Sequence, residues 1–212
     1  MRSPVSAGVA AAAWLSTAPG LAGTAFAADP VASPVEPRRL TVSVSASVIR
    51  PGDTAVRELY GGTQTAFGLD CELQVRGAFA LFAAGRFGTA RGSTAVLPPQ
   101  LFDESYGIEL STRSLHIGAA LTQSGLARLR WTAGAGLAVG SYEERWPALG
   151  DPVRGSTVGI VGRGGAHYSL TQRVGLVGRL EWSFLRALKA ADDGRNPNLG
   201  GLGLSFGASA RF

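Results

Sequence analysis

The sequence predicts an all-β protein whose fold class is an eight-stranded antiparallel up-and-down transmembrane β-barrel. From Leu40 onward, apolar and polar residues alternate with a period of two, in stretches long enough to cross a bilayer. The connections between these stretches are alternately short and long. The composition agrees, because 17% charged residues is below the roughly 25% usual in soluble domains, and 30 glycines in 212 residues is about twice the usual share.

The first 27 residues are predicted to be a secretory signal peptide rather than part of the fold. A basic residue near the start is followed by an apolar run over 7–15 and by a small-residue cleavage site at 25–27. The run is too short for a membrane-spanning helix, which needs about 20 apolar residues. Residues 28–39 are predicted to be a Pro-rich linker, and residues 40–212 the β-barrel.

Eight stretches of the chain alternate in the manner of strands. In the first, Leu40, Val42 and Val44 interleave with threonine and serine. Each stretch has roughly the 9 to 11 residues of a tilted transmembrane strand. No window repeats apolar residues at helical spacing, so no long helix is predicted. The predicted strands are 40–48, 66–75, 79–88, 113–121, 129–140, 157–168, 174–184 and 201–212.

The predicted connections alternate in length. Short turns follow the second, fourth and sixth strands, at 76–77, 122–128 and 169–172. Long loops follow the other strands, at 50–64, 89–112, 141–156 and 185–200. Short turns at one end and long loops at the other are typical of an up-and-down membrane barrel. Trp146 falls in the third long loop and is expected to be exposed there.

The less apolar face of the strands is predicted to line a narrow interior. It holds mostly glycine, alanine and serine, whereas a face in water would carry abundant lysine, glutamate and threonine. Isolated charges in such a space must pair, so we predict a plug of arginine and carboxylate side chains. Glycines such as Gly134, Gly136 and Gly207 are expected to make room for the arginines. The predicted interior charge cluster is Asp70, Glu72, Arg86, Arg130, Arg163, Arg179, Glu181 and Arg211, with His116 and His167 on the same face.

The apolar face carries aromatic residues toward the strand ends. Trp131 and Tyr168 fall near the short turns, and Phe87 and Trp182 near the long loops, as in the aromatic girdles of membrane barrels. Cys71 is interpreted as a small lipid-facing residue, and a single cysteine excludes an internal disulfide. A soluble β-sandwich also alternates and would place the aromatic residues in its core, so it stays as an alternative.

The signal peptide, the eight amphipathic strands and the terminal run over 202–212 resemble the small outer-membrane β-barrel proteins of Gram-negative bacteria, the OmpA/OmpX-like eight-stranded barrels. The resemblance covers nearly all of the chain after the signal peptide. It implies an outer-membrane location and Phe212 as the assembly signal that the barrel-assembly machinery reads. It also implies outer-membrane lipid and lipopolysaccharide as partners.

No catalytic residue, cofactor or metal site is predicted. His167 and Ser169 share a strand face, but no carboxylate is evident to orient the histidine. His116 has no histidine, cysteine or carboxylate nearby at ligand spacing. The arginines are scattered without a basic run, so nucleic acid is not expected as a partner, and the chain is expected to be a monomer. Five loop arginines are candidates for lipopolysaccharide phosphates or ordinary solvated charges: Arg57, Arg91, Arg145, Arg154 and Arg195.

The predicted function is therefore structural or surface-interacting, with a plugged interior and no catalysis. A narrow channel or lateral conduit for small or apolar molecules is the alternative. It would require the glycine-lined interior to leave a continuous path.

Overall fold

The computed structural model describes residues 39–94, 106–125, 128–146, 152–188 and 196–212. The predicted signal peptide over 1–27 and the predicted linker up to residue 38 lie outside the described residues. The first strand begins at Arg39, one residue before the predicted start of the barrel.

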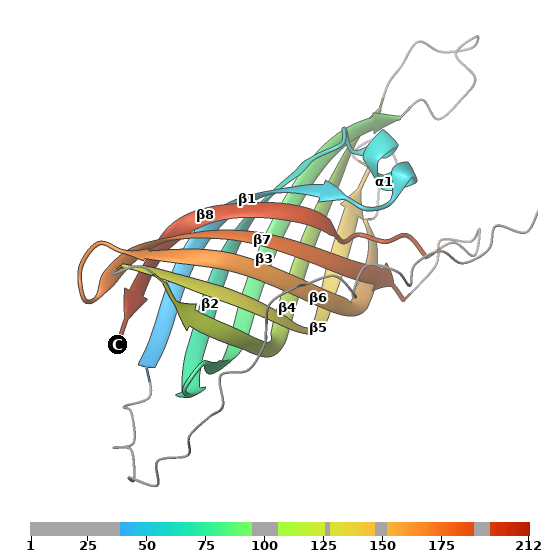
Figure 1. Ribbon diagram of the computed structural model, residues 1–212. Coiled ribbons are helices and arrows are strands. Elements are labelled where there is room, and N and C mark those ends of the chain that lie inside the picture. The colour runs from blue at the N-terminus through green and yellow to red at the C-terminus, as the bar shows by residue number, and fades with distance from the viewer. Residues whose placement is uncertain (1–38, 95–105, 126–127, 147–151, 189–195) are drawn as a thin grey trace, which may run out of the picture. The chain divides into compact units, whose positions relative to one another are not determined.

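Eight antiparallel strands form a closed barrel in which each strand pairs with its neighbours in sequence and the first pairs with the last (Figure 1). This confirms the predicted fold class and excludes the sandwich. The strands are β1 (Arg39–Pro51), β2 (Gln64–Arg76), β3 (Phe79–Thr94), β4 (Tyr106–Ser124), β5 (Leu129–Arg145), β6 (Val153–Ser169), β7 (Val174–Ala187) and β8 (Gly201–Arg211). The turns β2–β3, β4–β5 and β6–β7 lie at one end, which we call the short-turn end, and the other end is the long-loop end.

The outward face of the barrel is apolar on every strand. Large hydrophobic side chains are exposed around the whole wall, for example Val44, Phe67, Leu81, Ile117, Leu137, Ile160, Leu180 and Phe206. The predicted girdle residues Trp131, Tyr168, Phe87 and Trp182 are exposed on the same face. Water does not tolerate so continuous an apolar surface on a monomer, whereas lipid covers it without cost. The wall therefore has the surface of a membrane-spanning barrel.

Strands β3 to β6 continue beyond their predicted ends into the predicted loops 89–112 and 141–156. Arg91 pairs with Glu109 across β3 and β4, and Glu143 pairs with Arg154 across β5 and β6. Cross-strand pairs of opposite charge support such a ladder in water. The predicted strand limits were wrong here because the strands continue beyond the point where apolar residues stop occupying the outward face.

Within strand β4 the apolar residues change from the outward face to the inward face. In β4, Leu115 and Ile117 point outward, but Ile108 and Leu110 are buried inside. The strand keeps its direction while its surroundings change from lipid to water, so the apolar residues move to the inner face. This inversion places the edge of the apolar wall on β4 near Arg113, which is exposed.

The interior glycines have two different roles. At Gly68 an added Cβ would lie 2.6 Å from Arg86 Nη1, so this glycine makes room for an arginine as predicted. At Gly134, Gly136 and Gly207 an added Cβ would instead overlap a backbone carbonyl of the neighbouring strand. For these three the prediction was wrong, because close approach of the strand backbones, not an arginine, excludes a side chain.

A short helix, α1 (Thr54–Leu59), lies in the predicted loop 50–64. Asp53 caps it, and its carboxylate accepts a hydrogen bond from the backbone amide of Ala55 at 2.9 Å. Arg57 donates to the carbonyl oxygens of Pro51 and Gly52 and ties the helix to the end of β1. Within the described ranges, no helix is long and apolar enough to cross a membrane.

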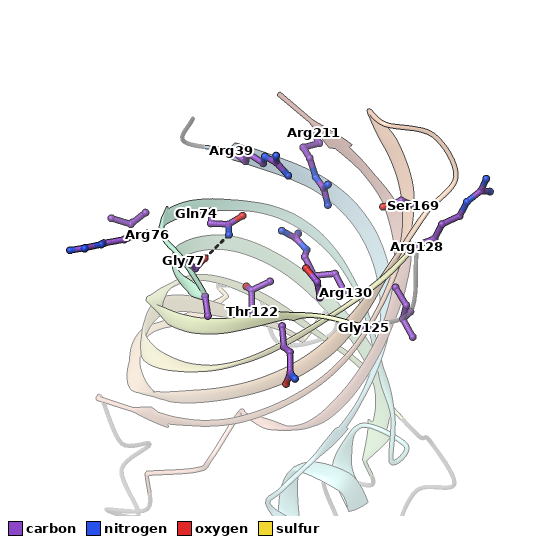
Figure 2. Close-up of a pocket in the computed structure, with 15 residues that line it drawn as sticks. Arg39, Gln74, Arg76, Gly77, Thr122, Gly125, Arg128, Arg130, Ser169 and Arg211 are labelled. Atoms are coloured by element: carbon purple, nitrogen blue, oxygen red, sulfur yellow. Dashed lines mark hydrogen bonds between the residues drawn. The ribbon is translucent and has the colours of Figure 1, made fainter. Parts of the chain in front are cut away.

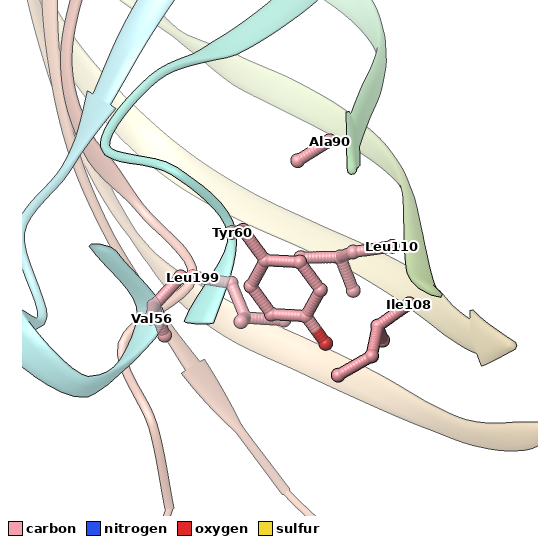
Figure 3. Packing of buried hydrophobic residues seen from close by; sticks show 6 residues of the cluster. All are labelled: Val56, Tyr60, Ala90, Ile108, Leu110 and Leu199. Atoms are coloured by element: carbon pink, nitrogen blue, oxygen red, sulfur yellow. The ribbon is translucent and has the colours of Figure 1, made fainter. Parts of the chain in front are cut away.

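A cluster of buried apolar side chains lies beside α1 at the long-loop end (Figure 3). We call it the apolar cap, and it consists of Val56, Tyr60, Ala90, Ile108, Leu110 and Leu199. Trp146 packs against it, half-buried, and its indole Nε1 donates to Glu144 Oε1 at 2.8 Å. The expectation of an exposed Trp146 was therefore wrong, because the long-loop end has an apolar core of its own.

Candidate functional site

The predicted interior charge cluster comes from strands on all sides of the barrel. Asp70, Arg86, Arg130, Arg163 and Arg179 point inward and are buried. Glu72 is also buried, and Glu181 is nearly so, with 13% of its side chain exposed. Seven of the eight predicted residues thus lie inside the barrel, because period-two alternation puts them all on the inner face.

Asp70 is the centre of the cluster. Arg86 donates to it with two parallel bonds, Nη1 to Oδ2 at 2.9 Å and Nη2 to Oδ1 at 3.0 Å. Arg163 Nη1 lies 3.2 Å from Oδ1, and Arg179 Nη1 lies 2.9 Å from Oδ2. Since β2 and β6 stand opposite each other in an eight-stranded barrel, the contact of Asp70 with Arg163 spans the interior.

Glu72 extends the cluster toward the short-turn end. Arg163 Nη2 lies 3.3 Å from Glu72 Oε2, and Arg130 Nη2 lies 3.3 Å from Glu72 Oε1. The guanidinium of Arg163 also stacks over the ring of Phe82, with its Cζ 3.5 Å from the centroid. Arg163 therefore joins both carboxylates of β2 while an aromatic face holds its plane.

Glu181 extends the cluster toward the long-loop end. Arg86 Nη2 donates to Glu181 Oε2 at 2.9 Å, and His116 Nδ1 lies 3.3 Å from Glu181 Oε1. The other ring nitrogen of His116 is 2.9 Å from Ser114 Oγ. The expectation that His116 has no carboxylate neighbour was wrong, because Glu181 comes from β7 on the far side of the barrel. The spacing of Ser114 and His116 on one strand face was the only sequence signal for this group.

Arg211 and His167 do not join these ion pairs. Arg211 is half-buried at the short-turn end and has no carboxylate partner among the described residues. His167 is buried, and its Nε2 has no hydrogen-bond partner in the described chain. The charged groups that act on it are arginines, among them Arg130, Arg179 and Arg211.

The charge network, as we call Asp70, Glu72 and Glu181 with Arg86, Arg130, Arg163 and Arg179, has four guanidinium groups for three carboxylates. Desolvation of each ion costs several kcal/mol, so each group depends on its partners. The bidentate arginine geometry recovers much of that cost. A small excess of positive charge remains inside the barrel.

Cavities lie on both sides of the charge network. A cavity of about 30 Å³ lies between Glu181 and the apolar cap residue Leu199. An open cavity of about 480 Å³ lies at the short-turn end, with Arg130 in its wall (Figure 2). Residues of the charge network line both cavities, Arg130 the open one and Arg86 and Glu181 the small one.

Ionisable groups at the long-loop end lie outside the apolar wall. Burial and the neighbouring carboxylate of Glu144 raise the pKa of Tyr60 well above its usual range. Hydrogen bonds from Arg145 and Arg154 lower the pKa of Glu143. Arg91, Arg145 and Arg154 are paired with carboxylates, and Arg57 with carbonyls, whereas Arg195 lies outside the described residues.

No protein-family model and no curated protein sequence matches the chain. Solved structures do match it. Neisserial surface protein A (NspA) aligns over 82% of this chain and 95% of its own, at 10% identity and a TM-score of 0.51. This chain has the fold of the small outer-membrane β-barrels.

Two further matches have slightly lower scores. Ail, the attachment invasion locus protein of Yersinia pestis, was solved in complex with the heparin analogue sucrose octasulfate. It is 11% identical over 82% of this chain and 97% of its own, with a TM-score of 0.49. The N-terminal β-barrel domain of Pseudomonas aeruginosa OprF is 14% identical over 81% and 97%, with a TM-score of 0.48. At such identities the likeness of these barrels concerns the fold alone.

Proposed function

We propose that this protein is an outer-membrane barrel, exported with a cleaved signal peptide, whose role is structural or surface-interacting. Its interior is filled by the charge network and does no catalysis. The observation that carries the proposal is the bridge from Asp70 on β2 to Arg163 on β6, which crosses the interior between two separate cavities. A narrow channel or lateral conduit would need these side chains to part.

Conductance in a planar bilayer tests the sealed interior against the channel. The refolded protein is expected to give no unitary current steps, because the paired side chains fill the path. Asp70→Ala removes the centre of the network and is the matched variant, expected to conduct if it folds. Steady unitary steps from the unaltered protein would establish the channel instead.

Membrane residence is tested by fractionation. We expect the protein in the outer-membrane fraction, with a faster migration on a denaturing gel before boiling than after. Recovery from the soluble periplasm, with equal migration in both samples, would refute the membrane role.

The proposal of no catalysis faces one arrangement that resembles a catalytic triad, Ser114, His116 and Glu181. The neighbouring cavity of about 30 Å³ has room for about one water and none for a substrate. Arg86 already donates to Glu181 Oε2, and the backbone amides of β4 around Ser114 take part in the ladder with β3, so the described strands offer no oxyanion hole there. A fluorophosphonate probe is expected to leave Ser114 unlabelled. Labelling that Ser114→Ala abolishes would show a reactive nucleophile.

The proposed partners are the lipids around the wall, including lipopolysaccharide, and the barrel-assembly machinery. Phe212 is 75% exposed, and its backbone bonds to Leu40 at the seam between β1 and β8. The side chain is therefore free for recognition during assembly. Phe212→Ala is expected to lower the amount of folded barrel in cells and to leave refolding in detergent unchanged. Equal loss in both would indicate a purely structural role.

A further inference from the structure

The cavity at the short-turn end is a basic chamber open to solvent (Figure 2). Its volume of about 480 Å³ falls in the range of small-ligand sites, about 300–1,000 Å³. No aspartate or glutamate is among its described lining residues. Its arginines are Arg39, Arg76, Arg128, Arg130 and Arg211.

Three of these arginines converge. Figure 2 shows the guanidinium groups of Arg39, Arg130 and Arg211 directed toward the opening, from β1, β5 and β8. Arg76 and Arg128 stand on the rim and point away from it. The charges of Arg211 and Arg39 both repel Arg130, so both lie within electrostatic reach of it.

Arg130 forms the floor of the chamber and is held in place from behind. Its Nη2 lies 3.3 Å from Glu72 Oε1 and donates to Thr41 Oγ1 at 3.4 Å. Its side chain is only 10% exposed, and its Nε is buried without a hydrogen-bond partner in the described chain. A buried donor without a partner costs free energy that a bound acceptor would recover.

Unlike Arg130, which contacts Glu72, Arg39 and Arg211 have no carboxylate partner among the described residues. The like charges that face this chamber repel one another, and an anion bound between them offsets that repulsion. The planar donor fork of arginine matches the oxygens of a phosphate group.

We propose that this chamber binds a phosphate-bearing anion, held by Arg39, Arg130 and Arg211. A free phosphorylated molecule and the headgroup of an anionic phospholipid share this chemistry. The site is independent of the proposed function, because its residues and its test do not depend on whether the barrel conducts.

The test uses the full barrel refolded in octyl glucoside, which contains no phosphate, titrated with inorganic pyrophosphate by calorimetry. The double variant Arg39→Gln with Arg211→Gln removes the two converging arginines that stand outside the charge network. We expect it to weaken binding by about tenfold per guanidinium. The matched control, Arg76→Gln with Arg128→Gln, makes the same change in net charge at the same end and is expected to bind nearly as the unaltered protein does.

A second arm tests the lipid source. The barrel is placed in nanodiscs of phosphatidylcholine with or without phosphatidylglycerol, and its thermal unfolding midpoint is measured. Binding of pyrophosphate supports a free ligand. A rise in midpoint with phosphatidylglycerol that Arg39→Gln with Arg211→Gln abolishes supports the headgroup. The proposal would be overturned if the protein responded neither to pyrophosphate nor to phosphatidylglycerol. It would also be overturned if the two double variants lost binding equally, since that would show only a general attraction of anions.

Discussion

The middle of the barrel interior is filled by the charged side chains of the charge network, and its long-loop end by the apolar side chains of the apolar cap. In the charge network, arginines and carboxylates from five strands meet around Asp70. In the apolar cap, by contrast, Tyr60, Ile108 and Leu110 pack through apolar contacts. Strand β3 supplies a side chain to each region, Arg86 to the charge network and Ala90 to the apolar cap.

The difference follows from what lies outside the wall. Where lipid surrounds the barrel, burial of apolar groups inside gains little, and the apolar residues serve on the outer face. The inner face is then free to be polar, provided that its charges are paired. Where water surrounds the barrel, the hydrophobic effect acts in the usual direction and draws Ile108 and Leu110 inward.

Removal of the central carboxylate, that of Asp70, is expected to cause the largest loss of stability. Asp70→Ala leaves Arg86, Arg163 and Arg179 short of a partner in a buried site, and we expect a loss of about 3–5 kcal/mol in the free energy of unfolding. Urea unfolding in lipid vesicles measures it. Glu109→Ala removes one side of an exposed pair and is the control, with an expected loss under about 1 kcal/mol. Equal losses would mean that the charge network contributes no more than surface pairs.

Truncation in the apolar cap is expected to have the next largest effect. Ile108 is 1% exposed, and Ile108→Ala should cost about 2–3 kcal/mol, because it leaves a cavity. Limited proteolysis should show earlier cleavage at the long-loop end. Ile117→Ala on the same strand faces outward, where lipid chains fill the space, and should cost less. If Ile117→Ala costs more, the inversion of β4 would be wrong.

A smaller effect is expected from the space beside Arg86. Gly68→Ala would place a methyl group 2.6 Å from Arg86 Nη1 and push the guanidinium away from Asp70, at a cost of about 1–3 kcal/mol. Gly85→Ala, on the neighbouring strand, meets only the ring of Phe87 at 3.7 Å and should be tolerated. Unfolding midpoints compare the two, and equal midpoints would show that Arg86 has room to spare.

The smallest effect is a pH dependence at the long-loop end. The pKa of Glu143 is lowered by Arg145 and Arg154, so its stabilisation is complete above the ordinary carboxyl pKa and is lost as the pH falls through the lowered value. Amide exchange in the outer part of β5 and β6 should therefore speed up in acid. Glu143→Gln should abolish this faster exchange in acid. If exchange in the variant still became faster in acid, a group other than Glu143 would be responsible.

The sequence alone determined the wall and the faces of the barrel. Alternation with a period of two decides which side of a strand each residue occupies, so the inward positions of Asp70, Glu72 and Arg163 could be predicted from one strand at a time. It does not decide which inward residues meet, because that depends on how the closed barrel staggers its strands.

Only the tertiary structure brought Glu181 to His116, placed Arg211 with Arg39 and Arg130, and gathered the apolar cap around α1. A six-residue helix and an inverted alternation leave too little signal in the sequence. The contacts that fill the interior join strands far apart in the chain, and their partners become neighbours only when β1 closes on β8.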